Sequence, residues 1–319
     1  MKTKALKPDI IMHTDLSPAL AYLDSQVLGK QHQIKLAVTC LLADGHLLIE
    51  DLPGMGKTTL SHALATVFGL HFSRIQFTSD LLPADMLGVN IYNTRQGEFE
   101  FHQGPVFSQV VLADEINRAS PKTQSALLEA MEENQVSIDG STHSLPSPFF
   151  VIATQNPSYQ AGTYPLPESQ LDRFLMRISL GYPDGEAEKR MLRESAGVSS
   201  HHQKPASQVL SAEQLQAIQK QVSDIHVSDP ILDYLLRLVN QSRDNSEFPY
   251  PLSPRASKAL MRAAQAWALL HQRDFVLPED LQAIFTAVAE HRLRGSQTDY
   301  REDGLLSQRI LDLTDPLAA

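Results

Sequence analysis

Asp-Leu-Pro-Gly-Met-Gly-Lys-Thr, residues 51–58, lies between an apolar run at residues 46–50 and a helix-like run that begins near Thr59. Gly54 and Gly56 allow backbone N–H groups to turn toward a polyphosphate, and the helix that follows presents its positive N-terminal end to the same charge. Lys57 is expected to reach the β and γ phosphates, and the hydroxyl of Thr58 is expected to bind Mg²⁺. The stretch therefore predicts a loop that binds a polyphosphate together with Mg²⁺.

The loop departs from the usual pattern G-x-x-x-x-G-K-[ST] at its first position, where Asp51 replaces glycine. An ordinary turn before a capped helix can also read Pro-Gly-x-Gly, so the interpretation depends on the surrounding sequence. The loop residues expected to contact the nucleotide are Asp51, Pro53, Gly54, Met55, Gly56, Lys57, Thr58 and Thr59.

A second run, Val-Val-Leu-Ala at residues 110–113, ends at Asp114 and Glu115. A short apolar run closed by carboxylates is typical of a buried parallel strand, and open α/β sheets bind ligands at that edge. Asp114 is expected to hold Mg²⁺ through water, and Glu115 to polarise the attacking water. Such a run alone is more often a strand that ends at a solvated turn, but beside a phosphate loop it favours a hydrolytic site.

The chain is long enough, at 319 residues, for about two domains with a substantial core. A net charge of −10 and a pI near 5.6 argue against a broad nucleic-acid footprint, because binding to the phosphate backbone depends on clustered Lys and Arg. A local groove is not excluded. Cys40 is the only cysteine, so the chain has no intramolecular disulfide and no Cys-based metal site, as suits a reducing compartment.

The N-terminal segment carries Lys2, Lys4 and Lys7 but no apolar stretch of the length that a secretory signal requires. No run approaches the roughly 18 apolar residues of a membrane span. The sequence therefore predicts a cytoplasmic protein without a membrane span.

Apolar runs alternate with helix-like runs through the first half of the chain. Strands are expected at residues 46–50, 71–78, 109–114, 149–154 and 175–180, and helices at residues 59–68, 121–133 and 168–174. This alternation predicts an α/β fold with a parallel five-stranded sheet and helices on both faces. Two hairpin-like insertions, at about residues 88–104 and 134–147, interrupt the pattern.

A turn-rich break at residues 181–185 separates this half from a second half that is typical of helices only. Helices are expected at residues 186–195, 212–222, 229–242, 254–271 and 278–290. We expect an α/β nucleotide-binding domain at residues 1–183, an all-α domain at residues 184–294 and a partly helical tail at residues 295–319. The apolar residues of the tail have roughly helical spacing, which favours docking on its own domain over binding a partner.

Residues 112–133, which contain Leu-Ala-Asp-Glu-Ile-Asn-Arg, resemble the Walker B strand and following helix of the MoxR-type AAA+ ATPases. Residues 153–174 are similar to the same family through Ala-Thr-Gln-Asn-Pro, Gly-Thr-Tyr-Pro-Leu-Pro-Glu and Gln-Leu-Asp-Arg-Phe. The resemblance covers nearly the whole chain, from residue 27 to about residue 292. It implies an AAA+ P-loop domain followed by a helical lid, in the helix-2-insert branch, and it makes Asp51 a tolerated variant.

The resemblance also implies roles for three residues beyond the phosphate loop. Asn156 matches sensor 1, a polar side chain that helps Glu115 orient the lytic water, although Asn-Pro is also a frequent Asx turn. Arg173 matches the arginine finger that a neighbouring subunit inserts at the γ-phosphate. Without the family, Arg173 would be interpreted as a cation at a helix C-terminus. Arg255 matches sensor 2, which reaches the nucleotide from the lid.

Gly29, Lys30 and Gln31 lie where relatives contact the adenine. Arg118 either faces the neighbouring subunit or lies in a solvated loop. Relatives form hexameric rings and work with partners that contain a von Willebrand factor A domain, so the resemblance implies both for this chain.

Two functions of different class follow from these observations. The preferred one is a ring-forming ATPase chaperone that remodels a client protein or assists assembly of, or metal insertion into, a complex. The alternative is a DNA- or RNA-acting motor, because helicase relatives share the inserts. Such motors need cations on their hairpins, whereas residues 134–147 contain no Lys or Arg and residues 88–104 contain only Arg95. The sequence therefore disfavours the motor, and nucleic acid is not an expected partner.

Overall fold

The structure is a computed structural model that describes residues 14–156, 162–195, 209–295 and 304–316. The N-terminal segment with Lys2, Lys4 and Lys7, and residues 296–303 of the tail, lie outside the described residues. Among the helices that are described, none combines the length and the apolar character needed to cross a membrane.

A five-stranded parallel sheet lies at the centre of the α/β half, in the order β2-β5-β8-β1-β9. Register is fixed across the middle of the sheet, where Leu112 of β5 and Leu47 of β1 both lie opposite Ile152 of β8. The sheet confirms the predicted α/β fold. Its strands are β1 (Leu47–Glu50), β2 (Phe72–Gln76), β5 (Val110–Asp114), β8 (Phe150–Gln155) and β9 (Met176–Ile178).

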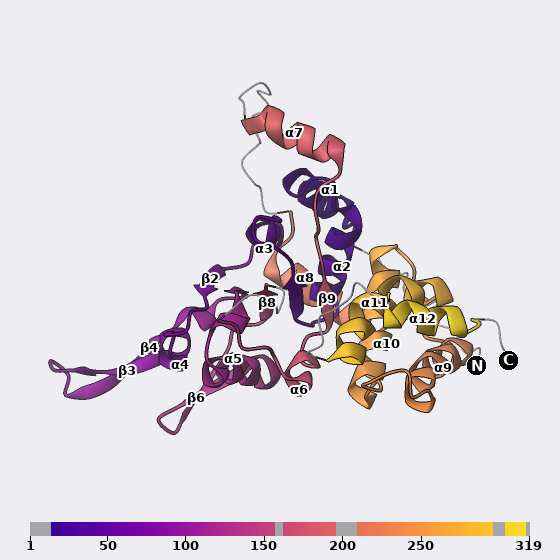
Figure 1. The fold of residues 1–319 in the computed structure, drawn as a ribbon. Helices are drawn as coiled ribbons and strands as arrows, with labels where there is room; N and C mark the ends of the chain where they lie inside the picture. The colour runs from indigo at the N-terminus through magenta and orange to yellow at the C-terminus, as the bar shows by residue number, and fades with distance from the viewer. Residues whose placement is uncertain (1–13, 157–161, 196–208, 296–303, 317–319) are drawn as a thin grey trace, which may run out of the picture.

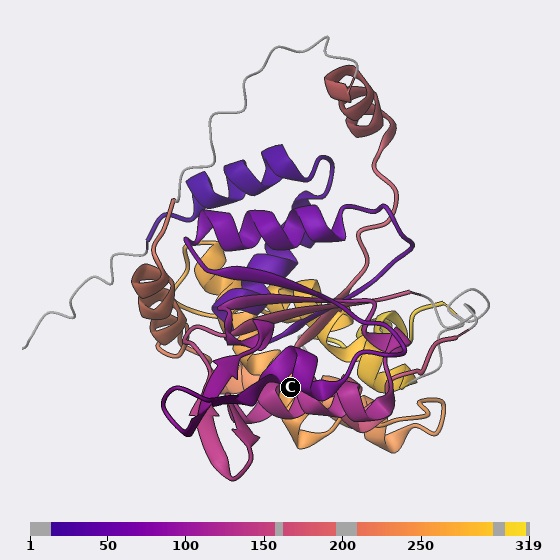
Figure 2. The ribbon, with the colours of Figure 1, turned by 90° about the vertical axis from the view of Figure 1, so that its left-hand side faces the viewer.

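Both faces of the sheet are buried along its central strands, β1, β5 and β8, because successive side chains of a strand point to opposite faces and both sets are largely apolar. In β1, Leu47 and Ile49 join the core that includes α1 (Ser17–Gln26), α2 (Gln31–Leu42) and α3 (Lys57–Val67). Leu48, between them, joins a second core with α5 (Pro121–Glu133). Figure 2 shows the sheet between the indigo N-terminal helices and the magenta α5. The helices therefore cover both faces, as predicted.

Two hairpins project from the same end of the α/β half (Figure 1). The first, after α4 (Pro83–Leu87), consists of β3 (Gly88–Asn93) and β4 (Glu98–Gln103), and the second of β6 (Gln135–Ile138) and β7 (Ser141–Ser144). Two contacts join them: Asn90 Nδ2 donates to Asp139 Oδ2 at 2.7 Å, and the rings of Phe101 and His143 stack with centroids 4.0 Å apart.

The second half of the chain is helical, and most of its helices form the lid cluster on the right of Figure 1. The cluster contacts the α/β half through α11, whose His291 and Arg292 side chains hydrogen-bond to the carbonyl of Phe174, just before β9. This half confirms the predicted helical lid. After residue 208, its helices are α8 (Ala212–Val222), α9 (Asp229–Asp244), α10 (Pro254–Leu270), α11 (Pro278–Arg294) and α12 (Leu306–Leu313).

The helix of the tail, α12, docks on its own chain. The buried carboxylate of Glu290, on α11, accepts hydrogen bonds from the N–H groups of Leu306 and Ser307 at 3.2 and 2.7 Å. By contrast, α7 (Gly185–Ser195) stands apart from the lid helices, near α1 (Figure 1). A Cβ at Gly29 would lie 3.0 Å from Ala187 Cβ, so the start of α7 contacts the turn before α2.

Candidate nucleotide site

The phosphate loop connects β1 to α3 and contains two glycines with left-handed backbone. Gly54 has φ +85° and Gly56 has φ +88°, which other residues adopt only with strain. A Cβ built at either glycine meets nothing within 4 Å, so conformation rather than crowding requires glycine here. Gly56 is the N-cap of α3, which directs the positive end of that helix into the loop.

The loop borders a cavity of about 500 Å³ at the carboxyl edge of the sheet. The cavity brings together side chains from the ends of three neighbouring strands and the first turn of α3, which is where open α/β sheets bind ligands. It is lined by Pro53, Gly54, Gly56, Lys57, Thr58, Thr59, Arg74, Gln76, Asp114, Glu115 and Asn156.

Lys57 is the buried cation of this cavity. Its side-chain ammonium donates to the backbone carbonyl of Asp51 at 2.9 Å. Burial lowers the pKa of Lys57, and the nearby carboxylates of Asp114, Asp51 and Glu115 oppose that shift. A phosphate group in the cavity would supply an anionic partner for this ammonium.

The side chain of Asp51 contacts the segment that follows β9 rather than the cavity. Its carboxylate accepts hydrogen bonds from the N–H groups of Leu180 and Gly181 and from the hydroxyl of Ser179. Asp51 is buried and is not among the residues that line the cavity. The carboxylate at the usual glycine position thus binds the phosphate loop to the segment after β9, and a contact between Asp51 and the nucleotide stays a prediction.

Asp114 ends β5 and is held on both carboxylate oxygens. Thr154, on β8, donates its hydroxyl to Oδ1 at 2.6 Å, and the guanidinium of Arg74, on β2, contacts Oδ2 at 2.6 Å. The carboxylate and the hydroxyl of Thr58 border the same cavity. Both are hard oxygen ligands, so the donor set fits a Mg²⁺ ion that also binds phosphate oxygens.

Glu115 follows directly, with a left-handed φ of +58° that turns its side chain away from the line of β5. Asn156 Nδ2 donates to one carboxylate oxygen at 2.9 Å, and Gln76 Nε2 donates to the other at 3.1 Å. Arg118 forms an ion pair with the same carboxylate at 3.1 Å. Among the described residues, the buried Oδ1 of Asn156 has no hydrogen-bond partner, and a donor such as water would satisfy it.

Three residues of this network, Arg74, Gln76 and Thr154, were missed by the sequence reasoning. Arg74 and Gln76 are two positions apart on β2, so they share a face of the strand. Polar residues at the carboxyl end of a predicted parallel strand are the signal that indicates them. The apolar run at residues 149–154 included Thr154, and nothing in the sequence alone distinguished its hydroxyl from an ordinary strand threonine.

Arg173 and Arg255 are not among the lining residues of the cavity. Arg173 follows α6 (Glu168–Leu171), and its guanidinium donates to the carbonyl of Leu128 at 2.6 Å and pairs with Glu132 at 3.0 Å. Arg255, in the first turn of α10, pairs with the other oxygen of Glu132. The two arginines are therefore brought together, but on α5 rather than at the phosphate loop of their own chain.

The residues expected near the adenine also lie outside the lining residues of the cavity, as does Met55, which packs against the core. Gly29 has φ +70°, and the ammonium of Lys30 donates to the carbonyl of Tyr182 at 2.5 Å. Gln31 begins α2. The turn before α2 is thus bound to the segment that leads into α7, and its contact with a base stays a prediction.

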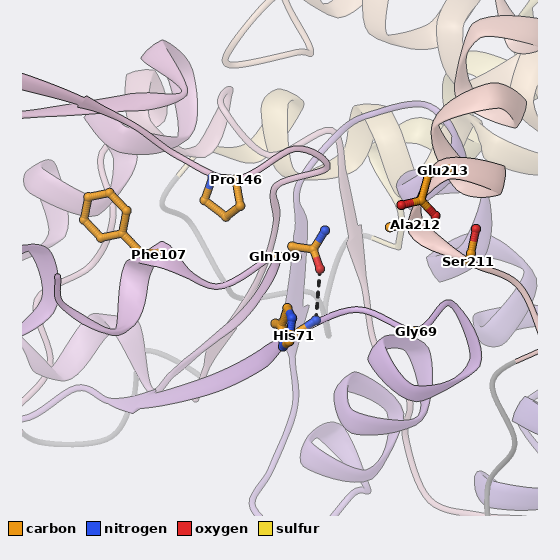
Figure 3. A pocket seen from close by; sticks show the side chains of 8 residues that line it. All are labelled: Gly69, His71, Phe107, Gln109, Pro146, Ser211, Ala212 and Glu213. Atoms are coloured by element: carbon orange, nitrogen blue, oxygen red, sulfur yellow. Dashed lines mark hydrogen bonds between the residues drawn. The ribbon is translucent and has the colours of Figure 1, made fainter.

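A second cavity of about 510 Å³ lies where strands β2 and β5 begin, at the end of the sheet opposite to the phosphate loop (Figure 3). Its wall includes Phe107, Pro146 and Glu213, and the side chain of Gln109 accepts a hydrogen bond from the backbone N–H of His71 at 3.1 Å. This cavity has no glycine loop and no pair of carboxylates. The site at the phosphate loop is therefore the better candidate for chemistry on a nucleotide.

Comparison with known proteins gives two family matches. Residues 46–176 match the ATPase family associated with various cellular activities (AAA), and residues 240–312 match the AAA lid domain. The first range contains the phosphate loop, Asp114, Glu115 and Asn156. The second begins within α9 and ends within α12.

Similar proteins extend the match to most of the chain. The uncharacterized protein YeaC of Bacillus subtilis is 47% identical over 282 residues, 88% of each chain. Chaperone MoxR1 of Mycobacterium tuberculosis is 40% identical over 291 residues, 88% of this chain and 76% of that one. A crystal structure of a Cytophaga hutchinsonii protein, assigned provisionally to the ATPases, is 37% identical and has a TM-score of 0.83 over 94% of this chain and 93% of that one. With its glycine loop, paired carboxylates and helical lid, the chain belongs to the MoxR family of AAA+ ATPases, which hydrolyse ATP.

Proposed function

We propose that the chain assembles into a hexameric ring and uses ATP hydrolysis, with Mg²⁺, to remodel a client protein or to assist assembly of, or metal insertion into, a complex. A protein with a von Willebrand factor A domain is its proposed partner. In this proposal residues 1–183 bind the nucleotide, residues 184–294 form the lid and residues 295–319 form the tail. Lys57, Thr58, Asp114, Glu115 and Asn156 act in the subunit that binds ATP.

The observation that carries the ring is the position of Arg173. Its guanidinium points at α5, where it contacts Leu128 and Glu132, and it does not line the phosphate cavity of its own chain. A finger that acts on the γ-phosphate must then reach the cavity of another subunit. Arg255 shares the carboxylate of Glu132, so we propose that it acts on the same neighbouring site as Arg173.

The hairpins support a protein client over a nucleic acid. Their exposed side chains include Tyr92 and Phe99 beside Glu98 and Glu100, a mixture of apolar and acidic groups. Phosphate backbones bind to clustered cations, and Arg95 is the single Lys or Arg of residues 88–104 and 134–147.

Mixing of subunits tests the ring. Arg173→Ala protein should bind ATP but hydrolyse it very slowly, and Lys57→Ala protein should not bind it. Together they should regain activity, because some interfaces would join an intact phosphate loop to an intact finger. An arginine finger contributes on the order of 10³- to 10⁵-fold in rate, so even a minority of repaired interfaces should exceed either parent.

The matched control mixes Lys57→Ala with Glu115→Gln, whose defects lie in the same site and should complement less well. Two results would overturn the proposal: assembled Arg173→Ala protein that hydrolyses ATP at the parent rate, or activity per subunit that stays constant on dilution to monomers.

A further inference from the structure

Glu132, in the last turn of α5, lies between Arg173 and Arg255. One carboxylate oxygen is 3.0 Å from Arg173 Nη2, and the other pairs with Arg255 Nη2. Arg173 also donates from Nη1 to the carbonyl of Leu128, one turn earlier on α5. A single carboxylate thus contacts residues that are 41 and 123 positions away in the chain.

The backbone beside Arg173 is fixed from the other side, by the lid. The carboxylate of Asp172 accepts a hydrogen bond from Arg292 Nε, on α11, at 2.6 Å and one from the hydroxyl of Ser253, before α10, at 3.3 Å. The position of the Arg173 side chain therefore depends on α5, and the position of its backbone depends on the lid. Glu132, on α5, also contacts the lid, because its partner Arg255 belongs to the lid helix α10.

Helix stability does not account for this arrangement. A carboxylate in the last turn of α5 and a cation in the first turn of α10 each oppose the helix dipole, at a cost of about 0.3–1 kcal/mol apiece. Ion pairs this exposed, with 35% of the Glu132 side chain and 50% of the Arg255 side chain accessible, contribute little stability in return. What the carboxylate does provide is alignment, since two cations held on one carboxylate lie side by side.

We propose that Glu132 is a positioning residue that aligns Arg173 and Arg255 as one cationic pair for the phosphates bound by a neighbouring subunit. The inference rests on the proposed role of Arg173 in the neighbouring site. It assigns no contact with the nucleotide to Glu132, which acts only through the two guanidinium groups.

Glu132→Ala, measured as assembled protein, should lower kcat about ten- to hundredfold, as expected when a catalytic group is misplaced by about 1 Å, and should leave the ATP dissociation constant unchanged. Glu132→Gln, which keeps an acceptor but loses the charge, should fall between Glu132→Ala and the parent. Glu133→Ala, which removes an exposed carboxylate from the next position, is the matched control and should keep the parent rate.

Two further measurements separate positioning from a general structural role. Glu132→Ala combined with Arg255→Ala should lose less activity than the product of the two single losses, because Glu132 acts partly through Arg255. Mixed with Lys57→Ala subunits, Glu132→Ala protein should regain activity as Arg173→Ala protein does. Parent kcat in Glu132→Ala, or fully multiplicative losses in the double variant, would overturn the positioning role.

These results also distinguish the inference from the proposed function. If Arg173→Ala loses activity and complements in mixtures while Glu132→Ala is unaffected, only the positioning role fails. If Arg173→Ala itself hydrolyses ATP at the parent rate, the finger assignment fails and the positioning role fails with it.

Discussion

Thr154 donates its hydroxyl hydrogen to Asp114 Oδ1 at 2.6 Å, although the two residues are 40 positions apart in the chain. The same hydroxyl accepts a hydrogen bond from the backbone N–H of Glu115 at 2.8 Å. One buried side chain on β8 therefore orients the expected metal ligand and fixes the backbone of the expected base.

Thr154→Val should lower the rate of ATP hydrolysis about ten- to hundredfold, as is usual when a group that orients a metal ligand is lost. The variant keeps the shape of the side chain but leaves Asp114 Oδ1 and the N–H of Glu115 without this partner. Steady-state kinetics with a Mg²⁺ titration would measure the change, and Thr154→Ser, which keeps the hydroxyl, should stay near the parent. Equal rates for Val and Ser would show that the hydroxyl does not matter.

Lys57→Ala should abolish detectable ATP binding, because it removes the buried ammonium that faces the cavity. Isothermal titration would measure the dissociation constant. Lys122→Ala, which removes an exposed lysine of α5, provides the control and should bind as the parent does. Unchanged affinity in a folded Lys57→Ala protein would rule out the phosphate loop as the binding site.

Glu115→Gln should bind ATP like the parent and hydrolyse it about 10²- to 10⁴-fold more slowly, the usual loss when a general base is removed. The amide keeps the size of the side chain and can still accept a hydrogen bond from Asn156. Single-turnover kinetics would measure the rate of hydrolysis, and an equilibrium titration would measure ATP binding separately. A turnover equal to that of the parent would assign the activation of water to another residue.

Asp51→Gly restores the usual first glycine of the loop, and we expect it to destabilise the protein by about 1–3 kcal/mol. The substitution removes the acceptor for the N–H groups of Leu180 and Gly181, and a buried donor without a partner costs about that much. Urea unfolding at pH 7 would measure the loss, and Asp51→Asn, which keeps one side-chain oxygen, should lose less. A more stable Asp51→Gly protein would contradict the structural role of the carboxylate.

His46 should make the protein sensitive to acid. Burial lowers the pKa of His46 from 6.5 to about 4, and its ring accepts a hydrogen bond from the N–H of Val151 at 3.1 Å, which protonation would break. Between pH 6.5 and 4 the unfolded chain binds the proton and the folded chain does not. His46 therefore contributes stability that is present above pH 6.5 and is lost as the pH falls toward 4, up to about 3 kcal/mol.

Urea unfolding across that pH range would measure the effect. His46→Asn, which stays neutral, should show a smaller loss on acidification. A residual loss is expected because burial also lowers the pKa of His291. An equal loss in the parent and the variant would remove His46 as its cause.

The sequence predicted the sheet well because its central strands, β1, β5 and β8, are largely apolar runs whose side chains are buried on both faces. The sequence predicted the helix boundaries less well where contacts with distant residues override the local pattern. The helix expected at residues 168–174 ends at Leu171, where the carboxylate of Asp172 instead accepts from Arg292, 120 positions away. The glycines, Lys57 and the two carboxylates line one cavity, and local motifs singled them out in the sequence. Gln76 lines the same cavity but belongs to no local motif.

Arg255 shows most clearly which contacts a local sequence pattern cannot predict. The resemblance predicted that Arg255 reaches a nucleotide from the lid, and the anion that it contacts in this structure is the carboxylate of Glu132. No spacing rule connects positions 132 and 255, because the pairing depends on how the lid packs against the α/β half. Whether Arg255 also meets a nucleotide stays a prediction.

The contacts between Asn90 and Asp139 and between Phe101 and His143 join the two projecting hairpins to each other. An isolated two-stranded hairpin is only marginally stable in water. Braced against each other, the two can keep their shape far from the sheet. A load applied to the tip of β3 and β4 would therefore pass through β6 to the end of α5, one turn from Leu128 and next to the carboxylate that holds both arginines.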